Sequence, residues 1–199
     1  MLSPPRVAPF NSGIRMHTPT LTPAHPDRLY VGWIDGGLVI LDIADKAHPK
    51  LVMHRSWQSL GNGFAHTLVA IPSRNLMIQS EEATAANCKD WPKRDWVWDI
   101  SDETNPVPLA VFPPPADFAA LCKAGGRFGA HNIDMNRPIT TSRTLTRTVV
   151  GSFFNGGIRP IRSRTLTIRW RSAIWSKPRR RGTPRTRSRS TMSMSMRMA

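Results

Sequence analysis

Acidic residues are absent from the last 65 residues of the chain (199 − 134 = 65). All 13 Asp and Glu side chains of the 199-residue sequence lie at or before Asp134. Residues 1–158 hold 15 basic and 13 acidic side chains (15 − 13 = +2), and residues 159–199 hold 13 basic and no acidic ones (+13), which together make the total of +15. A charge of this size spread over a protein indicates a nucleic-acid or anionic-membrane partner. Because nearly all of it belongs to the end of the chain, the remainder is a near-neutral protein that composition does not assign to such a partner.

Long apolar runs and a secretory leader are also absent. No run approaches the ~18–20 residues of a membrane-spanning helix, and the N-terminal MLSPPRVAPF lacks the charged-then-apolar order of a signal peptide. We therefore expect no membrane span and a cytoplasmic location. The two cysteines, Cys88 and Cys122, are too few for a disulfide scaffold and lack zinc-ligand spacing. One bridge between them fits the sequence, and two reduced thiols fit it at least as well in a chain without an export signal.

The chain has instead a succession of short β-prone runs separated by turn residues. Residues 1–28, rich in Pro, Thr and His without periodicity, are expected to be irregular. Residues 29–43 (LYVGWIDGGLVILDI) then predict a hairpin that turns at Gly36 and Gly37, because glycine adopts positive φ cheaply. Residues 50–54 predict the next strand.

The same pattern continues along the chain. Residues 63–82 offer two further strand-like runs, and residues 148–159 repeat the strand-then-glycine arrangement at Gly156 and Gly157. Helical patterning is thin, and residues 116–124 (ADFAALCKA) predict the one convincing short helix. The sequence therefore predicts an all-β fold.

A turn motif recurs after 57 residues. When Asp42 is superposed on Asp99 (99 − 42 = 57), an apolar run precedes both and a second strand-like stretch follows both. The aligned residues are Asp42, Asp45 and Pro49 in the first copy and Asp99, Asp102 and Pro106 in the second. The aspartates can accept backbone N–H bonds in the turn, and the proline stops the ladder from continuing. Self-similarity of this kind, made of short strands, predicts a repeat or propeller architecture.

These residues carry a family resemblance. GGLVILDIADKAHPKLV resembles the signature of LVIVD-repeat proteins, a family of bacterial β-propellers, and WVWDISDETNPVP and SFFNGGIR resemble its later repeats. GFAHTLVAIP, SEEATAANC and GGRFGAHNIDMNRP are similar to the insertions of one large branch. The resemblance covers roughly residues 15–159 and implies about two and a half blades of a ring of about seven. Biochemical function is not established for most of the family, so the resemblance implies a fold more than an activity.

The end of the chain matches nothing in that family. Residues 160–199, without acids or periodicity, read as a disordered basic tail. The codons of this segment can also be read in a frame that begins one base earlier. In that frame, residues 190–199 permit a strand followed by a turn. Residues 164–174 permit a proline seven positions after an expected aspartate site. Asp42 to Pro49 has that same spacing (49 − 42 = 7). We therefore expect a truncated chain with a frameshift near Arg159, and three segments: residues 1–28, the partial propeller at 29–159, and the tail.

Histidines provide the candidate site. His66 in GFAHTL and His131 in FGAHN each precede a strand-like run, and propeller strands near the axis bring such positions toward the central channel. Converging imidazoles could bind a divalent transition metal. His17 is a third candidate ligand, and Glu81, followed by Glu82, could add a carboxylate. The alternative is that these histidines cap strands or bond to backbone carbonyls.

Three functions are compatible with these features. Repeats are clear whereas no catalytic set is, so the first is a non-enzymatic propeller scaffold that binds an unknown protein or small ligand at its channel mouth. The second is a metal-dependent, oxidoreductase-like enzyme with His66 and His131 as ligands. The third is nucleic-acid binding through residues 160–199, which applies only if that tail is genuine.

Overall fold

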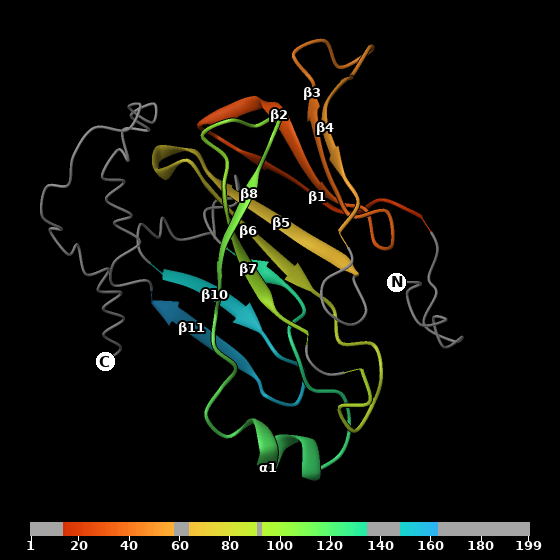
Figure 1. Cartoon of the computed structure of the whole chain (residues 1–199), viewed down its shortest axis with the longest axis vertical. Helices are drawn as coiled ribbons and strands as arrows, with labels where there is room; N and C mark the ends of the chain where they lie inside the picture. The colour runs from red at the N-terminus through yellow and green to blue at the C-terminus, as the bar shows by residue number, and fades with distance from the viewer. Residues whose placement is uncertain (1–13, 58–63, 91–92, 135–147, 163–199) are drawn as a thin grey trace, which may run out of the picture. The chain divides into compact units, whose positions relative to one another are not determined.

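The chain is mostly β, as expected. A computed structural model describes residues 14–57, 64–90, 93–134 and 148–162, which contain three antiparallel sheets and little helix (Figure 1). The chain divides into two units, Met1–Ile161 and Arg162–Ala199, and all the strands below belong to the first unit apart from the last residue of β11.

Each of the first two sheets is a four-stranded meander, and the third has three strands. The first sheet runs in the order β1 (His17–Thr22), β2 (His25–Gly32), β3 (Leu38–Asp42) and β4 (Lys50–Arg55). The second runs β5 (Ala65–Ile71), β6 (Leu76–Glu81), β7 (Asp95–Asp99) and β8 (Val107–Val111), with the 3-10 turn η1 (Pro72–Arg74) between β5 and β6. The third pairs β9 (Ile133–Asp134), β10 (Thr148–Ser152) and β11 (Ile158–Arg162), and α1 (Phe118–Lys123) precedes it.

The first strands of the three sheets lie next to one another. β1 and β2 contact β5, and β5 contacts β9. All seven residues of β5 are buried, because neighbouring sheets cover the strand in addition to its partner β6. This burial explains why β5 is apolar along almost its whole length and does not alternate.

One core joins the first two sheets. Trp57, which follows β4, packs edge-on against Trp96 and Trp98 of β7, with ring centroids 5.0 and 4.6 Å apart. The indole N–H of Trp98 donates to the buried Oε1 of Gln79 at 3.0 Å. The buried members of this core are Tyr30, Leu38, Ile40, Met53, Ala65, Leu68, Ala70, Met77, Trp98 and Ile100.

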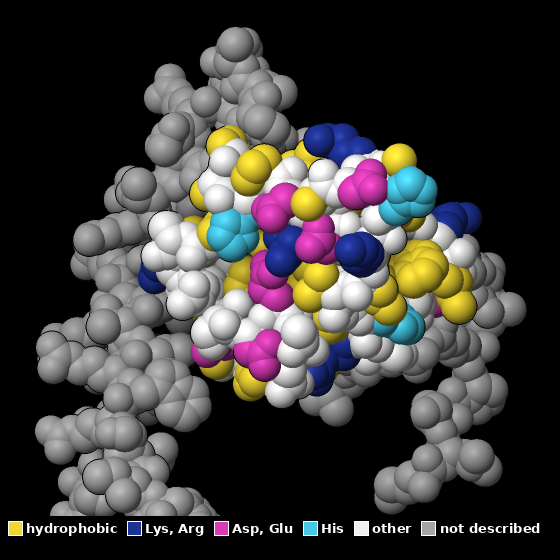
Figure 2. Space-filling view, turned by 90° about the horizontal axis from the view of Figure 1, so that it is seen from above, with side chains coloured by type: hydrophobic (Ala, Val, Ile, Leu, Met, Phe, Trp, Pro, Cys, Tyr) yellow, Lys and Arg dark blue, Asp and Glu magenta, His cyan; other side chains and the backbone are white. Residues whose placement is uncertain are grey.

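An acidic residue of the second sheet anchors the first. Glu103, in the turn after β7, accepts a hydrogen bond from the Tyr30 hydroxyl and pairs with Arg28 Nε at 2.9 Å. Arg28 also pairs with Asp42 at 3.1 Å. Figure 2 shows acidic and basic side chains interspersed on the face seen from above, in keeping with the near-neutral composition of this part of the chain.

The two aspartate turns have the same hydrogen bonds. Asp42 Oδ1 and Asp99 Oδ1 each accept from the backbone N–H two residues later, at 2.9 and 2.7 Å. Asp45 and Asp102 repeat this contact at 3.0 and 2.9 Å. Pro49 and Pro106 directly precede β4 and β8.

The two glycine turns also match. In residues 33–37 and 153–157, the N–H of the first residue donates to the carbonyl of the fifth, at 2.8 and 2.9 Å. Gly37 and Gly157 have φ of +94° and +75°, a conformation that glycine adopts without a Cβ clash.

The boundaries differ from expectation at both ends. The irregular segment expected to reach residue 28 contains β1 and the start of β2. Its prolines are tolerated because β1 is the edge strand of its sheet, where Pro19 breaks no second ladder, and Pro26 precedes the first β2–β3 pair at Arg28. At the other end β11 continues beyond Arg159, and the expected tail otherwise lies outside the described residues.

A buried carboxyl makes the fold sensitive to pH. Asp95, at the start of β7, is 3% exposed, and burial raises its pKa to about 7, with the Ser80 hydroxyl opposing the rise. The folded pKa lies above the unfolded value of about 3.9, so the folded state binds this proton more tightly. Stability from this group is therefore complete below pH ~4 and is lost as the pH rises toward 7.

Asp95→Asn keeps the shape of the side chain without its charge. We predict that the free energy of unfolding of this variant decreases less between pH 4 and 7 than that of the native chain. Each unit of pKa difference corresponds to about 1.4 kcal/mol, so the variant should lose at least ~1 kcal/mol less than the native chain between pH 4 and 7. Urea unfolding across this range measures the effect. Equal slopes for the two proteins would mean that Asp95 is not responsible.

Candidate metal site

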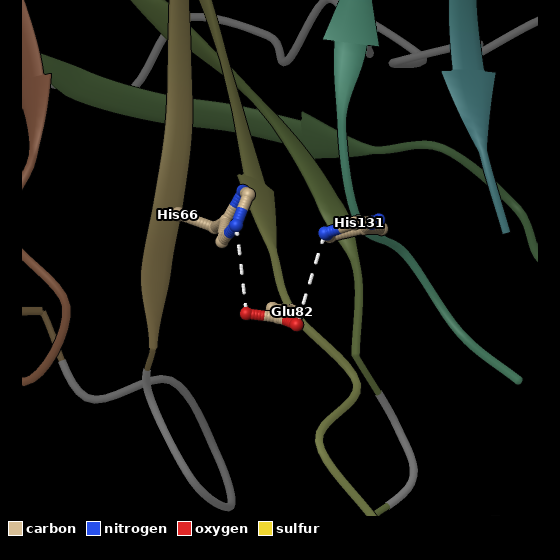
Figure 3. Close-up of side chains that lie close together, drawn as sticks. All are labelled: His66, Glu82 and His131. Atoms are coloured by element: carbon tan, nitrogen blue, oxygen red, sulfur yellow. Dashed lines mark ion pairs between the residues drawn. The ribbon is translucent and has the colours of Figure 1, made fainter. Parts of the chain in front are cut away.

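A side chain of β5 and two side chains from connections in other parts of the chain converge on one another. His66 is the second residue of β5, Glu82 directly follows β6, and His131 lies two residues before β9 (Figure 3). His66 Nε2 is 3.5 Å from Glu82 Oε2, and His131 Nε2 is 3.7 Å from Glu82 Oε1. One ligand atom from each of the three lies within 4.8 Å of the others.

Backbone pairing between consecutive sheets explains this convergence. Ala65, which precedes His66, exchanges hydrogen bonds of 3.0 and 3.1 Å with Ile34 of the first sheet's glycine turn. Ala130, which precedes His131, accepts a 3.0 Å bond from the N–H of Ala83 in the second sheet's connection. The two histidines therefore occupy corresponding places in successive sheets.

Gly32 allows this close approach. A Cβ at this position, the last of β2, would overlap the backbone carbonyl group of His66. The end of β2 can therefore lie directly against β5 only without a side chain.

The ring of His66 is neutral, and a contact with Thr67 fixes its orientation. Burial lowers its pKa to about 3, helped by the nearby His17, His131 and Arg127. His66 Nδ1 lies 2.8 Å from Thr67 Oγ1, whose hydroxyl donates to Asn132 Oδ1 at 3.3 Å. A proton on Nδ1 would satisfy both contacts and would leave the lone pair of Nε2 on the side of Glu82 for a metal.

His131 is held by stacking. Its ring lies on that of Phe154, with centroids 4.3 Å apart and planes within 15°. Burial lowers its pKa, with the carboxylate of Glu82 acting in the opposite direction. Asn132 Nδ2 is 3.5 Å from His131 Nδ1, and Asn132 Oδ1 accepts from Thr67, the residue that contacts His66.

The other two candidate ligands, His17 and Glu81, lie outside this three-residue group. The ring of His17 lies tilted against that of His66, with centroids 3.8 Å apart, and its Nδ1 contacts Thr18 Oγ1 at 2.7 Å. His17 therefore borders the three-residue group without belonging to it. Glu81 is fully buried and accepts from the Arg94 backbone N–H at 3.1 Å and the Trp96 indole N–H at 3.0 Å. The carboxylate beside the imidazoles is therefore that of Glu82.

Strand alternation is the sequence signal that separates these two acids. Neighbouring residues on a strand point to opposite faces, so only one of Glu81 and Glu82 can face His66. Choosing between them needs the pairing register, in which Ala65 lies opposite Glu81 across a bulge next to His66. The sequence alone does not give that register.

The comparisons with known proteins identify the repeat. The LVIVD repeat model matches residues 27–54, which run from β2 to β4. The matched repeat and the mostly β structure indicate a β-propeller-like repeat protein. No curated protein and no solved structure matches the chain. Among the helices of the described residues, none has the length and apolar character needed to cross a bilayer.

A disulfide links the connection that follows Glu82 to the helix that precedes His131. Cys88, in the connection after Glu82, is bonded to Cys122 of α1, with Cα atoms 5.5 Å apart. Nearby, the N–H of Asn87 donates to the carbonyl of Gly126 at 2.7 Å. The sequence left this pairing open. The cytoplasmic location stays a prediction, and a structural disulfide is more typical of an oxidising compartment.

We predict that Cys88→Ser/Cys122→Ser lowers the free energy of unfolding by about 2–4 kcal/mol, because the bridge closes a loop between residues 34 positions apart. Denaturant unfolding measures the change. A reductant should destabilise the native protein by a similar amount and leave the double variant unaffected. Equal stability of the two proteins under oxidising conditions would show that the bridge does not support the fold.

Proposed function

We propose that this chain is part of a β-propeller that binds a divalent transition metal through His66, Glu82 and His131. The observation that carries this proposal is the meeting of two imidazoles and one carboxylate within 4.8 Å. A neutral, buried His66 favours it further, because a metal ligand must be deprotonated. Two histidines with a carboxylate are a ligand set that zinc and non-haem iron both use.

The ligand count favours a reactive centre over a structural one. Structural zinc sites are closed by four protein ligands, whereas catalytic sites keep a position for water or substrate. The described part of the chain supplies three ligands, and the ring of His17 lies tilted against that of His66 without joining them. A bound metal would thus polarise a small ligand at its open position, as the oxidoreductase-like alternative requires, and a purely scaffolding role is less well supported.

The three sheets fit this proposal as successive propeller blades. β1, β5 and β9 would be the strands nearest the axis, and their neighbouring positions would bring His17, His66 and His131 to one channel. The described strands would make two full blades and most of a third, in a ring of about seven. We keep the proposed division into an N-terminal segment, a partial propeller and a tail, with its first boundary moved to the start of β1.

We also propose that the coding sequence is shifted near Arg159 and that a complete propeller continues in the other frame. The loss of acidic residues and the alternative decoding of two tail segments support this proposal. Sequencing the gene and its transcript across codon 159 tests it. An intact frame that encodes the basic tail would overturn it and would make nucleic-acid binding by residues 160–199 the question to pursue.

We predict that the full chain binds about one Co²⁺ or Zn²⁺, and that His66→Ala/His131→Ala abolishes stoichiometric binding. Removing one ligand by Glu82→Gln should weaken affinity by at least ~100-fold, because losing even an outer hydrogen-bond partner commonly costs 10–100-fold. Competition with a chelating indicator measures the affinity, and circular dichroism checks that each variant is folded.

His48→Ala provides the matched control. This imidazole lies in an exposed turn, where it pairs with Asp45 at 2.9 Å, and it is not one of the three clustered residues. It should leave metal binding unchanged. Retained binding in the double variant, or equal losses in the double variant and the control, would show that the metal binds elsewhere.

A further inference from the structure

Arg127 is the cation in contact with the proposed metal site. It comes from the loop between α1 and β9, and its Nη2 donates to Glu82 Oε1. Arg127 is also one of the charges that lower the pKa values of both His66 and His131. It therefore contacts the carboxylate of the three clustered side chains and is not itself a metal ligand.

The guanidinium is fixed in place from three sides. Its Nε and Nη2 both donate to the carbonyl of Ala83, at 3.0 and 2.7 Å. Its central carbon lies 3.9 Å from the centroid of Phe154, the ring that stacks on His131. Within the described part of the chain, Nη1 makes no hydrogen bond. One pair of N–H groups is thus held in a defined place without an acceptor among the described residues.

Exposure shows which side of the site is open. The side chains of His66 and Glu82 are 2% and 14% exposed, whereas those of His131 and Arg127 are 26% and 39% exposed. A ligand would therefore approach the metal past His131 and Arg127.

The charges at this opening favour an anion. The imidazoles of His66 and His131 count as neutral when they bind metal. Among the charges in direct contact there, a divalent ion and Arg127 together exceed the single negative charge of Glu82, so the open metal position would face an excess of positive charge. Arginine N–H groups match carboxylate and other oxyanion oxygens in geometry and form strong charge-assisted bonds.

We propose that Arg127 and the metal together form a subsite for a small oxyanion, such as a carboxylate. One oxygen would occupy the open metal position and another would accept from Arg127. This assignment rests on the proposed metal site and adds the class of ligand that the site takes. The competing role for Arg127 is to hold Glu82 in position, without contact to any ligand.

The test uses the full chain loaded with Co²⁺, whose visible absorption reports its coordination, and acetate as the probe. Acetate should change the spectrum of the native protein in a saturable way. Arg127→Gln should weaken acetate binding by about tenfold or more, because a hydrogen bond to a charged group is lost. Its affinity for Co²⁺ should change less than about threefold. Arg127→Lys keeps the positive charge but lacks the planar guanidinium with its paired N–H groups. Its affinity for acetate should lie between those of the native protein and of Arg127→Gln.

Arg74→Gln is the matched control, since it removes the same charge from η1, at the other end of β5 from His66. It should bind acetate as the native protein does. Unchanged acetate affinity in Arg127→Gln, or equal weakening in the control, would overturn the subsite. Loss of Co²⁺ in Arg127→Gln would assign Arg127 to holding Glu82 and would also overturn it. A native protein that binds no Co²⁺ would overturn the metal site itself, whereas Co²⁺ binding without any acetate response would overturn only the subsite.

Discussion

Backbone pairing between consecutive sheets is the constraint on which the site depends. The bonds of Ile34 with Ala65, and of Ala83 with Ala130, each join the turn of one sheet to the residue before a histidine in the next. Because the pairing uses main-chain groups, side chains can vary while the positions of His66 and His131 stay in register. The repetition of short sheets thus places equivalent residues of successive sheets close to one another.

The sequence predicted the turns, whose structure depends on the types of a few neighbouring residues. The aspartate turns at Asp42 and Asp99 and the glycine turns ending at Gly37 and Gly157 show the hydrogen bonds and φ values that those residue types favour. It did not predict β1, because a Thr- and Pro-rich edge strand has no alternating pattern to read and draws its stability from packing on β5. The same limit applies to Glu82, since the facing carboxylate follows from a bulged register and not from residue type.

His66 and His131 differ in how deeply they are buried, and therefore in how readily they are protonated. His66 lies deep between sheets, and its cost of protonation there keeps it neutral, whereas His131 lies nearer the surface against Phe154 and Arg127. Glu82 lies between the two imidazoles and also accepts a hydrogen bond from Arg127. The group is therefore arranged for binding by its surroundings, and Thr67 and Asn132 set its hydrogen-bond geometry.

The second sheet departs from the repeat at the point where the chemistry gathers. In the first and third sheets, a five-residue glycine turn joins the paired strands at 33–37 and 153–157. In the second sheet, the corresponding connection between β6 and β7 spans residues 82–94, and it begins with Glu82 and contains the disulfide partner Cys88. A long connection loses more conformational freedom when it is ordered, and a cross-link to α1 reduces that loss. β5 of the second sheet and the segment before β9 of the third thus supply the two imidazoles, and the cross-linked connection after β6 supplies the carboxylate that completes the ligand set.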